Sequence, residues 1–500
     1  MKPSKPHKIV LAYSGGLDTS VILPWLKDRY PGVQLVAYAA DLGQGAGELD
    51  GIEAKARKSG ADEVIVEDLR REFARDYCFP MLRAHAIYEQ DYLLGTSIAR
   101  PLIAKGQVLA ARKTAADAVS HGATGKGNDQ VRFELTYMAL APDLQIIAPW
   151  KDPSFELTSR EAAVDYAQRK GIPIAQSKEK IYSRDRNLWH CSHEGAEIEH
   201  PDQRVNDRVW LMTSSRRDAP ITPQTVKVRF KCGVPVAVDG KELAPEEIIS
   251  TLNHLGGIHA VGQVVMVENR LVGMKSRGAY ETPGGTILYQ AHKALEQLCL
   301  ERDTLHFKQQ VALRYSELVY NGQWFHPLRE ALQAFIDHTQ RNVSGEVSVE
   351  LWHGQATAVS ASADKSLYDT KLASFAMDGY DVTAARGFID LFGLPMKVAA
   401  MQGQVESAGA VPPASPSTLC RQASHTSPPL RSLPPQAHSP PEHRSLMATN
   451  SAFPLEMEPF PLRLPAPLEG LRTLAYDLTW VWTPNSRALF ESIAPDLWHA

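Results

Sequence analysis

The chain has 500 residues, a formal net charge of -4, 44% hydrophobic residues and 22% charged residues. This length predicts two or three domains, and the composition is that of an ordinary soluble globular protein. The slight acidic excess argues against a nucleic-acid-binding protein, which usually carries a clear basic excess. The five cysteines are far apart and form no CxxC pair, so we expect free thiols in a reducing compartment rather than a zinc or dithiol site.

The N-terminus carries basic residues, but its apolar run covers only residues 9–13. A signal peptide needs a longer apolar core, and no window of the chain approaches the length of a membrane-spanning helix. We therefore expect a cytoplasmic protein with no membrane segment and no nucleic-acid partner.

Residues 1–175 are expected to form an α/β domain built on a doubly wound parallel sheet. Residues 8–13 and 34–39 are apolar runs typical of buried parallel strands, and residues 19–29 between them have the apolar spacing of a helix. Strands that alternate with helices predict βαβ units. A second helix and three further strands are expected at residues 53–59, 63–66, 118–120 and 144–148.

Residues 176–401 change in character and are expected to form an α+β domain. Residues 225–238 hold two β-rich runs around a Cys-Gly pair, and residues 347–359 hold two more around a His-Gly pair, which is typical of hairpins. Strands and helices do not alternate regularly here, so a second parallel sheet is disfavoured. A further strand and three helices are expected at residues 263–268, 245–255, 286–300 and 305–320.

The C-terminal hundred residues have a different composition. Residues 402–455 are rich in Pro, Ser, Ala, His and Gln and lack the apolar content that offsets chain entropy, so we expect a disordered linker with polyproline II character. A ligand for an SH3-type domain is the alternative, but PxxP sequences occur in any proline-rich segment and a spacer is favoured. Residues 456–500 predict a short helical tail, with leucines at helical spacing at Leu468, Leu471, Leu474 and Leu478.

A glycine-bearing loop, Ser14-Gly-Gly-Leu-Asp-Thr-Ser20, joins the first expected strand to the first helix. Gly15 and Gly16 let backbone amides approach an anion, and the helix start adds unpaired N–H groups and a positive dipole end. Asp18 would repel a bare phosphate, so it indicates a bridging Mg²⁺. The plainer alternative is a glycine turn with a serine cap. The motif is neither a Walker A nor a GxGxxG sequence, and it resembles the PP-loop of ATP pyrophosphatases, which cleave ATP between the α- and β-phosphates.

A second polar cluster follows the expected strand at residues 118–120. Three glycines in residues 120–134 make a loop that suits an anion, and Asn128, Asp129 and Arg132 place donors, an acceptor and a guanidinium fork within about one helical turn. A surface loop with solvated charges is the alternative. Ligands bind at the carboxyl edge of open parallel sheets, so this position favours a binding site.

Five segments together resemble the argininosuccinate synthases. They are AYSGGLDTS, YLLGTSIARP, SHGATGKGNDQVRFE, YSRDRNLWHCSHEG and VENRLVGMKSRGAYETPGGT, in the family's order across residues 7 to 400. The resemblance implies that ATP activates citrulline as citrullyl-AMP, after which aspartate displaces AMP to give argininosuccinate in arginine biosynthesis. It also implies a homotetramer to which helices near residues 300 to 400 contribute.

The resemblance further implies a role for each matching position. ATP, as substrate, would contact Ala12, Tyr13, Ser14, Gly15, Gly16, Leu17, Asp18, Thr19, Ser20, Ala40 and Gly122. Aspartate would contact Thr124, Asn128 and Asp129. Citrulline would contact Tyr92, Ser97, Arg132, Ser183, Ser192, Glu268 and Tyr280, and Asn128 would touch both amino acids.

The chemistry of these side chains suits such roles. Arg132 can fork onto a carboxylate, Glu268 can pair with an ammonium, and Asp129 can bind the aspartate amine. We expect catalysis by positioning and charge neutralisation, with Asp18, Lys126 and Asp129 as the catalytic side chains and no covalent nucleophile. Lys126 is a candidate for electrostatic help at the phosphates because of its place in the second loop.

Plainer explanations exist for several of these residues taken singly. Tyr92 and Tyr280 could be core aromatics, and Ser97 could cap the helix that follows it. Glu268 and Arg270 could form a solvated pair at a strand end. Only their occurrence together, in the family's order, favours a site.

The residues of the sequence disfavour several other functions. His190 and His193 could suggest a metal site, but no third ligand is evident nearby, so we expect a structural role and no bound transition metal. A tRNA thiolase would need catalytic cysteines and a basic RNA-binding face, and the sequence indicates neither. A glutamine-fed synthetase would need a nucleophilic cysteine in an amidotransferase domain, and none is evident. A non-catalytic ATP-binding scaffold would not need Asp18, Asp129 and Arg132.

The last segment has a resemblance of its own. LEGLRTLAYDLTWVW and ALFESIAPDLW are similar to the N-terminal start of α-glucan phosphorylases. A phosphorylase needs hundreds more residues and a pyridoxal phosphate lysine, so we expect no phosphorylase activity. An interaction helix is the alternative for this segment, because its apolar face is large for its length.

Overall fold

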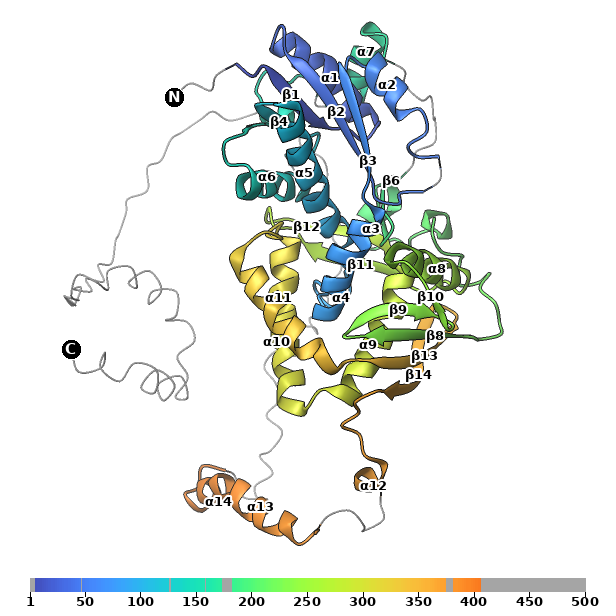
Figure 1. Cartoon of the computed structure of the whole chain (residues 1–500), viewed down its shortest axis with the longest axis vertical. Coiled ribbons are helices and arrows are strands. Elements are labelled where there is room, and N and C mark those ends of the chain that lie inside the picture. Colours follow the sequence, from blue (N-terminus) through green and yellow to red (C-terminus); the bar gives the residue numbers. More distant parts are fainter. Residues whose placement is uncertain are drawn as a thin grey trace, which may run out of the picture. The chain divides into compact units, whose positions relative to one another are not determined.

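The structure is a computed structural model that describes residues 5–45, 47–125, 127–157, 159–172, 182–374 and 381–405 (Figure 1). Four predicted features lie outside these ranges. They are the domain boundary at residue 175, Lys126, the linker from residue 406 onward and the tail at residues 456–500. Residues up to Leu394 belong to one compact unit. Within the described part of the chain, no helix is long and apolar enough to cross a membrane.

The first part of this unit is a five-stranded parallel sheet with helices on both faces (Figure 1). It consists of β1 (Lys8–Ala12), α1 (Leu17–Arg29), β2 (Gln34–Asp41), α2 (Ile52–Lys58), β3 (Glu63–Asp68), α5 (Gly95–Thr114), β4 (Ala118–Ser120), α6 (Asp129–Leu140), β5 (Gln145–Ile147) and α7 (Arg160–Arg169). The strand order is β3-β2-β1-β4-β5, and every neighbouring pair is parallel.

Alternate side chains of β1 face opposite layers of helices. Ile9 and Leu11 belong to a buried cluster with residues of α1 and α7, whereas Val10 and Ala12 belong to another cluster with residues of α5 and α6. A strand that is buried on both faces has a continuous apolar sequence. For this reason the sequence of β1 predicted a buried parallel strand. The predicted doubly wound sheet is confirmed.

The segment between β3 and α5 joins the first part to the second. It forms α3 (Arg70–Glu72), a π-helical turn (Phe73–Cys78) and α4 (Phe79–Ala84). Phe73, Tyr77 and Phe79 are buried in the large core cluster of the second part. The two parts are therefore packed together through a shared core and do not meet only at a surface.

Among the described residues, the second part contains two antiparallel sheets and four long helices. One sheet has the order β10-β9-β8-β13-β14, from β8 (Gln224–Lys231), β9 (Val234–Val238), β10 (Lys241–Glu242), β13 (Gly345–Trp352) and β14 (Gln355–Ala363). The other has the order β11-β12-β7-β6, from β6 (Ser183–Arg186), β7 (Cys191–Glu194), β11 (Gln263–Asn269) and β12 (Lys275–Glu281). The helices are α8 (Pro245–Ile258), α9 (Pro283–Cys299), α10 (Arg302–Tyr320) and α11 (Pro327–Thr339).

Both predicted hairpins are confirmed. β8 pairs with β9 and β13 pairs with β14, each antiparallel, and the turns hold Cys232-Gly233 and His353-Gly354 at positive φ. The helices expected at residues 245–255, 286–300 and 305–320 correspond to α8, α9 and α10, and the strand expected at residues 263–268 corresponds to β11. The irregular order of strands and helices confirms the α+β class of this part.

Candidate active site

The phosphate loop, residues 14–20, lies at the carboxyl edge of the parallel sheet, where it follows β1 and includes the first turn of α1. Gly15 has φ +73°, a left-handed conformation that glycine adopts without steric cost. The hydroxyls of Ser14 and Thr19 are 3.1 Å apart, and the Ser14 hydroxyl accepts a hydrogen bond from the Gly16 amide at 3.3 Å. The N-cap of α1 is Gly16 with no side-chain cap, so the alternative of a serine-capped turn is wrong.

The chain around the loop is held in place from the sheet. The Tyr13 amide donates to the Tyr38 carbonyl at 2.7 Å, and the hydroxyls of Tyr13 and Ser20 are 3.1 Å apart. Asp18 is exposed in the first turn of α1, whereas Thr19 and Ser20 are buried. Ala40 lies near the end of β2, at the same edge of the sheet. The predicted ATP residues of these two segments thus gather around the ends of two adjacent strands, β1 and β2.

The second glycine loop lies directly beside the phosphate loop. β4 is hydrogen-bonded to β1, so the loops that follow these strands leave the sheet at the same edge. A Cβ added to Gly122 would lie 2.9 Å from Thr19 Cγ2 and 3.4 Å from Ile22 Cδ1. The two loops are therefore in contact at this position, and a side chain there would have to displace Thr19.

Asp129, the first residue of α6, is held by two guanidiniums. Its Oδ2 accepts from Arg100 Nε at 2.9 Å, and its Oδ1 accepts from Arg132 Nη1 at 2.9 Å. Burial would raise the pKa of Asp129, but the two arginines outweigh burial and lower the pKa below its usual value. Asp129 is thus a carboxylate at neutral pH and can accept a hydrogen bond from an ammonium.

Tyr320, at the end of α10, organises the neighbouring side chains although no sequence pattern singled it out. Its carbonyl accepts from Arg132 Nε and Nη2 at 3.1 and 3.0 Å, and its hydroxyl accepts from Asn128 Nδ2 at 2.9 Å. Asn128 Oδ1 accepts from the Leu271 amide at 3.0 Å. Three of the five N–H groups of Arg132 are used by Tyr320 and Asp129, so two remain for a carboxylate.

The four strands of the β11-β12-β7-β6 sheet each carry one predicted citrulline residue. These are Glu268 on β11, Tyr280 on β12, Ser192 on β7 and Ser183 on β6. Tyr280 lies opposite Ser192, Ser183 lies opposite Glu194, and Glu268 lies opposite Ser276. Because side chains on a strand alternate with a period of two, this register places all four predicted residues on one face of the sheet.

Two predicted citrulline residues carry buried polar atoms that lack a partner. Ser97 is completely buried and Glu268 is 6% exposed, and neither Ser97 Oγ nor Glu268 Oε2 has a hydrogen-bond partner in the described part of the chain. A buried polar atom without a partner costs about 1–3 kcal/mol. Such a cost is expected where a polar ligand later supplies the partner.

The solvated-pair and helix-cap alternatives are wrong. Ser97 is the third residue of α5, whose N-cap is Leu94, so Ser97 is not the cap. Glu268 is buried, and Arg270 Nε lies 3.9 Å away while Arg270 Nη2 bonds Glu194 at 2.7 Å. Burial raises the pKa of Glu268, although Arg132, Arg270 and hydrogen bonding with the Tyr320 and Tyr280 hydroxyls oppose the shift.

The core-aromatic alternative is correct for the rings of Tyr92 and Tyr280, which lie in the large buried cluster with centroids 4.7 Å apart. The Tyr92 hydroxyl accepts a hydrogen bond from the Thr96 amide at 3.2 Å. Thr124 is exposed in the second loop, and Ser183 is exposed at the start of β6. Lys126 lies outside the described part of the chain, so its predicted role stays a prediction.

The two histidines considered for a metal have separate partners. His190 Nε2 is 2.9 Å from Thr96 Oγ1, and burial lowers the pKa of His190 to about 4, so it is neutral. His193 Nε2 bonds Glu281 at 2.7 Å, and with Cys191 these two could form a ligand cluster. However, the Glu281 carboxylate also accepts from three backbone amides and one hydroxyl of residues 211–213. Glu281 therefore anchors that loop.

A second cluster, His85, His292 and Glu296, lies in the core of the second part. His85 Nε2 and His292 Nδ1 are hydrogen-bonded at 2.7 Å. Lys308 Nζ lies 3.0 Å from Glu296 Oε1, so the carboxylate is already paired with a cation. This arrangement is a buried polar network and does not favour a metal ion.

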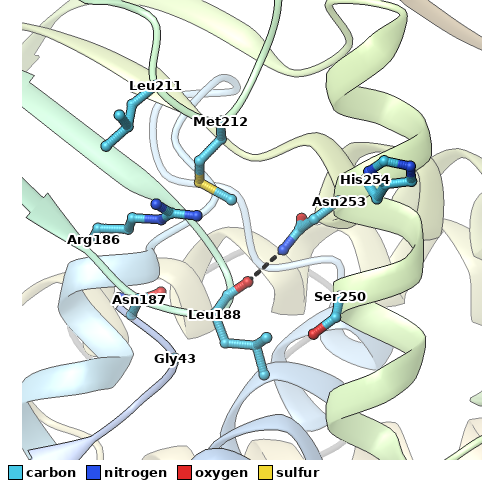
Figure 2. A pocket seen from close by; sticks show the side chains of 9 residues that line it. All are labelled: Gly43, Arg186, Asn187, Leu188, Leu211, Met212, Ser250, Asn253 and His254. Atoms are coloured by element: carbon cyan, nitrogen blue, oxygen red, sulfur yellow. Dashed lines mark hydrogen bonds between the residues drawn. The ribbon is translucent and has the colours of Figure 1, made fainter. Parts of the chain in front are cut away.

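A cavity of about 320 Å³ lies beside the turn between β6 and β7, and Figure 2 shows its lining side chains. None of the predicted site residues lines it. Asn253 Nδ2 donates to the Leu188 carbonyl at 2.7 Å across the cavity wall (Figure 2). Arg186 lines the cavity and is adjacent to Asp185 on β6, so the two side chains point to opposite faces of the sheet. The Arg186 side chain that lines the cavity thus lies on the other face of the sheet from Asp185.

The fold and the site define a class of protein. A parallel sheet with a phosphate loop after its first strand, facing carboxylates, guanidiniums and hydroxyls that suit charged small molecules, is the arrangement of an ATP-dependent ligase. The comparisons with known proteins specify which one.

Residues 8–173 match the family described as arginosuccinate synthase N-terminal HUP domain, and residues 182–399 match the arginosuccinate synthase C-terminal domain. Argininosuccinate synthase of Roseiflexus castenholzii is 55% identical over 399 residues, which cover 80% of this chain and 98% of that protein. The enzyme of Carboxydothermus hydrogenoformans is 57% identical over 396 residues, covering 79% and 98%. The chain therefore belongs to the argininosuccinate synthase family.

Two further similarities are weaker. Residues 464–500 match a family described as protein of unknown function (DUF3417), which is associated with the N-terminus of glucan phosphorylases, as the resemblance of this segment indicated. The U34-tRNA thiolase NcsA of Methanococcus maripaludis has a TM-score of 0.24 and 14% identity, covering 35% of this chain and 60% of that one. A similarity at that level has no bearing on the activity.

Proposed function

We propose that the two glycine loops and the β11-β12-β7-β6 sheet form one site in which ATP activates citrulline and aspartate captures the product. The observation that carries this proposal is the contact between the phosphate loop and the loop that leads to Asp129, at one edge of the parallel sheet. ATP lies on residues 12–20 with Ala40 and Gly122. Citrulline lies over the face that carries Glu268 and Tyr280.

The reaction follows from what each group can do. The ureido oxygen of citrulline attacks the α-phosphorus of ATP, a P–O bond forms, and pyrophosphate leaves. The aspartate ammonium then gives one proton to solvent, and the free amine attacks the activated carbon. A C–N bond forms, the C–O bond breaks, and AMP departs with the former ureido oxygen while the new nitrogen loses its second proton to solvent. The chain supplies positioning and charge, and no covalent intermediate with a side chain is needed.

The ends of the two amino acids are distinguished by charge. Glu268 pairs with the citrulline ammonium, and the two remaining N–H groups of Arg132 take its carboxylate. Ser97 Oγ and Glu268 Oε2, both buried without a partner in the described part of the chain, gain partners from citrulline. Asp129 receives the aspartate amine, and Thr124 with Asn128 donates to its carboxylates.

Mg²⁺ is part of the proposal because four negative charges of ATP meet Asp18 at the phosphate loop. The Asp18 carboxylate is exposed in the first turn of α1 and offers the oxygen ligand that Mg²⁺ prefers. Bound there, the ion would neutralise charge on the phosphates during departure of pyrophosphate. Lys126 stays a candidate for the same electrostatic task.

Association into a homotetramer is also proposed. α13 (Ala384–Phe392) exposes Phe388, Ile389, Leu391 and Phe392, each more than 60% accessible. An apolar face of this size is normally covered by another chain. The cytoplasmic location and the limits of the four segments, residues 1–175, 176–401, 402–455 and 456–500, stay predictions.

Release of pyrophosphate from ATP tests this function. We expect none without citrulline, at most one equivalent per site with citrulline alone, and steady release matched by AMP when aspartate is added. Pyrophosphate would be measured by a coupled phosphate assay and AMP by chromatography. Sustained release that needs neither amino acid would overturn the proposal.

A further inference from the structure

Arg100, on α5, lies between two carboxylates that come from different parts of the fold. Its Nε donates to Asp129 Oδ2 at 2.9 Å, and its Nη2 donates to Asp185 Oδ2 at 2.6 Å. Asp129 opens α6 beside the parallel sheet, whereas Asp185 lies on β6 of the antiparallel sheet. The Arg100 side chain is only 17% exposed. A planar guanidinium with donors on two edges can hold two carboxylates at a fixed angle, which an ammonium cannot do.

Asp185 is itself held in position. Thr96 Oγ1 donates to Asp185 Oδ2 at 3.0 Å, and it lies 2.9 Å from His190 Nε2. A hydroxyl has one proton, so the Thr96 oxygen must accept from His190 Nε2–H, which the neutral imidazole can supply. The start of α5 packs closely on this histidine, because a Cβ added to Gly95 would overlap the His190 ring. The chain of bonds therefore runs from His190 through Thr96 and Asp185 to Arg100.

We propose that Arg100 is a positioning residue for the amine of the second amino acid: Asp185 and Thr96 fix its guanidinium, and the guanidinium fixes the direction of Asp129. This inference rests on the proposed function, in which Asp129 receives the aspartate amine. Each oxygen of Asp129 already takes one N–H, from Arg100 and from Arg132, so its remaining lone pairs are restricted to directions away from both guanidiniums.

The other charges around Asp129 do not replace Arg100. Arg132 is bound to the Tyr320 carbonyl and reaches only the second oxygen, Oδ1. Glu194 has the same sign as Asp129, and Arg270 is bonded to Glu194 at 2.7 Å. Without Arg100, the Oδ2 atom of Asp129 would lose the partner that links it to the antiparallel sheet, and the carboxylate could rotate.

The test compares Arg100→Met with Arg112→Met in the full chain. Arg112 lies on the same helix and pairs with exposed Asp143, so it is a matched control. For Arg100→Met we expect KM for aspartate to rise about 10- to 100-fold, because the substitution removes one charge-assisted hydrogen bond to Asp129. Without aspartate, ATP and citrulline should still give one equivalent of pyrophosphate. Arg100→Met should form it at a rate within about threefold of that of the unsubstituted chain. Arg112→Met should change neither quantity.

Two further variants keep the outcome decisive. Arg100→Lys retains the charge but not the fork, so KM for aspartate should rise less than in Arg100→Met. Asp185→Asn should raise the same KM without changing the aspartate-free step. Equal loss of both steps in Arg100→Met and Arg100→Lys would overturn the inference, because that result means a structural role. An unmodified chain that forms no citrulline-dependent pyrophosphate would instead overturn the proposed function.

Discussion

Replacement of Gly122 by valine is expected to lower kcat/KM for ATP by about 10- to 100-fold, because overpacking of this kind costs roughly 1–3 kcal/mol. Even a Cβ at this position would lie 2.9 Å from Thr19 Cγ2 and 3.4 Å from Ile22 Cδ1. The added methyl groups must push the second loop away from the phosphate loop, and the shared edge of the sheet would open. Initial rates at varied ATP concentration measure the effect.

Gly125 provides the control for this substitution. It lies in the same loop, and a Cβ added there has no heavy atom within 4 Å. Gly125→Val should therefore leave kcat/KM for ATP within about threefold of the unsubstituted chain. If both valine variants lost activity equally, flexibility of the loop rather than contact between the two loops would be the cause.

Replacement of Glu268 by glutamine is expected to lower kcat/KM for citrulline by about 100-fold while KM for ATP stays within about threefold. The substitution keeps the shape but removes the charge that pairs with an ammonium, and a buried charge-assisted hydrogen bond is worth about 1.5–3 kcal/mol. Glu346, a partly exposed residue of β13 near Lys227, is the matched control, and Glu346→Gln should have no effect on citrulline.

The same substitution has a predicted pH dependence and a predicted effect on stability. Burial raises the pKa of Glu268, so kcat/KM for citrulline should fall as the pH falls through this raised value, and Glu268→Gln should lose that part of the profile. A carboxyl with a raised pKa in the folded chain opposes folding once it is ionised, so the free energy of unfolding at pH 7 should not decrease in Glu268→Gln. Equal loss of stability and activity would contradict a binding role.

The parallel sheet could be predicted from the sequence because its central strands are buried on both faces. β1 and β2 are apolar runs for that reason, and the loop between β1 and α1 has a glycine, Gly15, where φ is positive. β6 and β7 could not be predicted, since SRDR and CSHE are short, polar and without alternation. These strands exist because their neighbours in the sheet pair with them.

Contacts among the candidate site residues could be predicted where the residues follow one another along the chain, and not where they come from distant segments. Asn128, Asp129 and Arg132 stand within one turn, so their convergence was visible. Tyr320 meets Arg132 from 188 positions away, and Arg100 meets Asp185 from 85 positions away. An arginine within an apolar stretch at residues 98–104 was the available signal for Arg100, because a charge among apolar neighbours needs a partner.

The most direct test of the central claim follows the ureido oxygen of citrulline. If this oxygen attacks the α-phosphorus of ATP and leaves with AMP, citrulline labelled with ¹⁸O in the ureido group should yield AMP with one ¹⁸O per molecule and unlabelled pyrophosphate. Mass spectrometry of the two products in unlabelled water reads the outcome. Label in pyrophosphate, or AMP without label, would contradict the account.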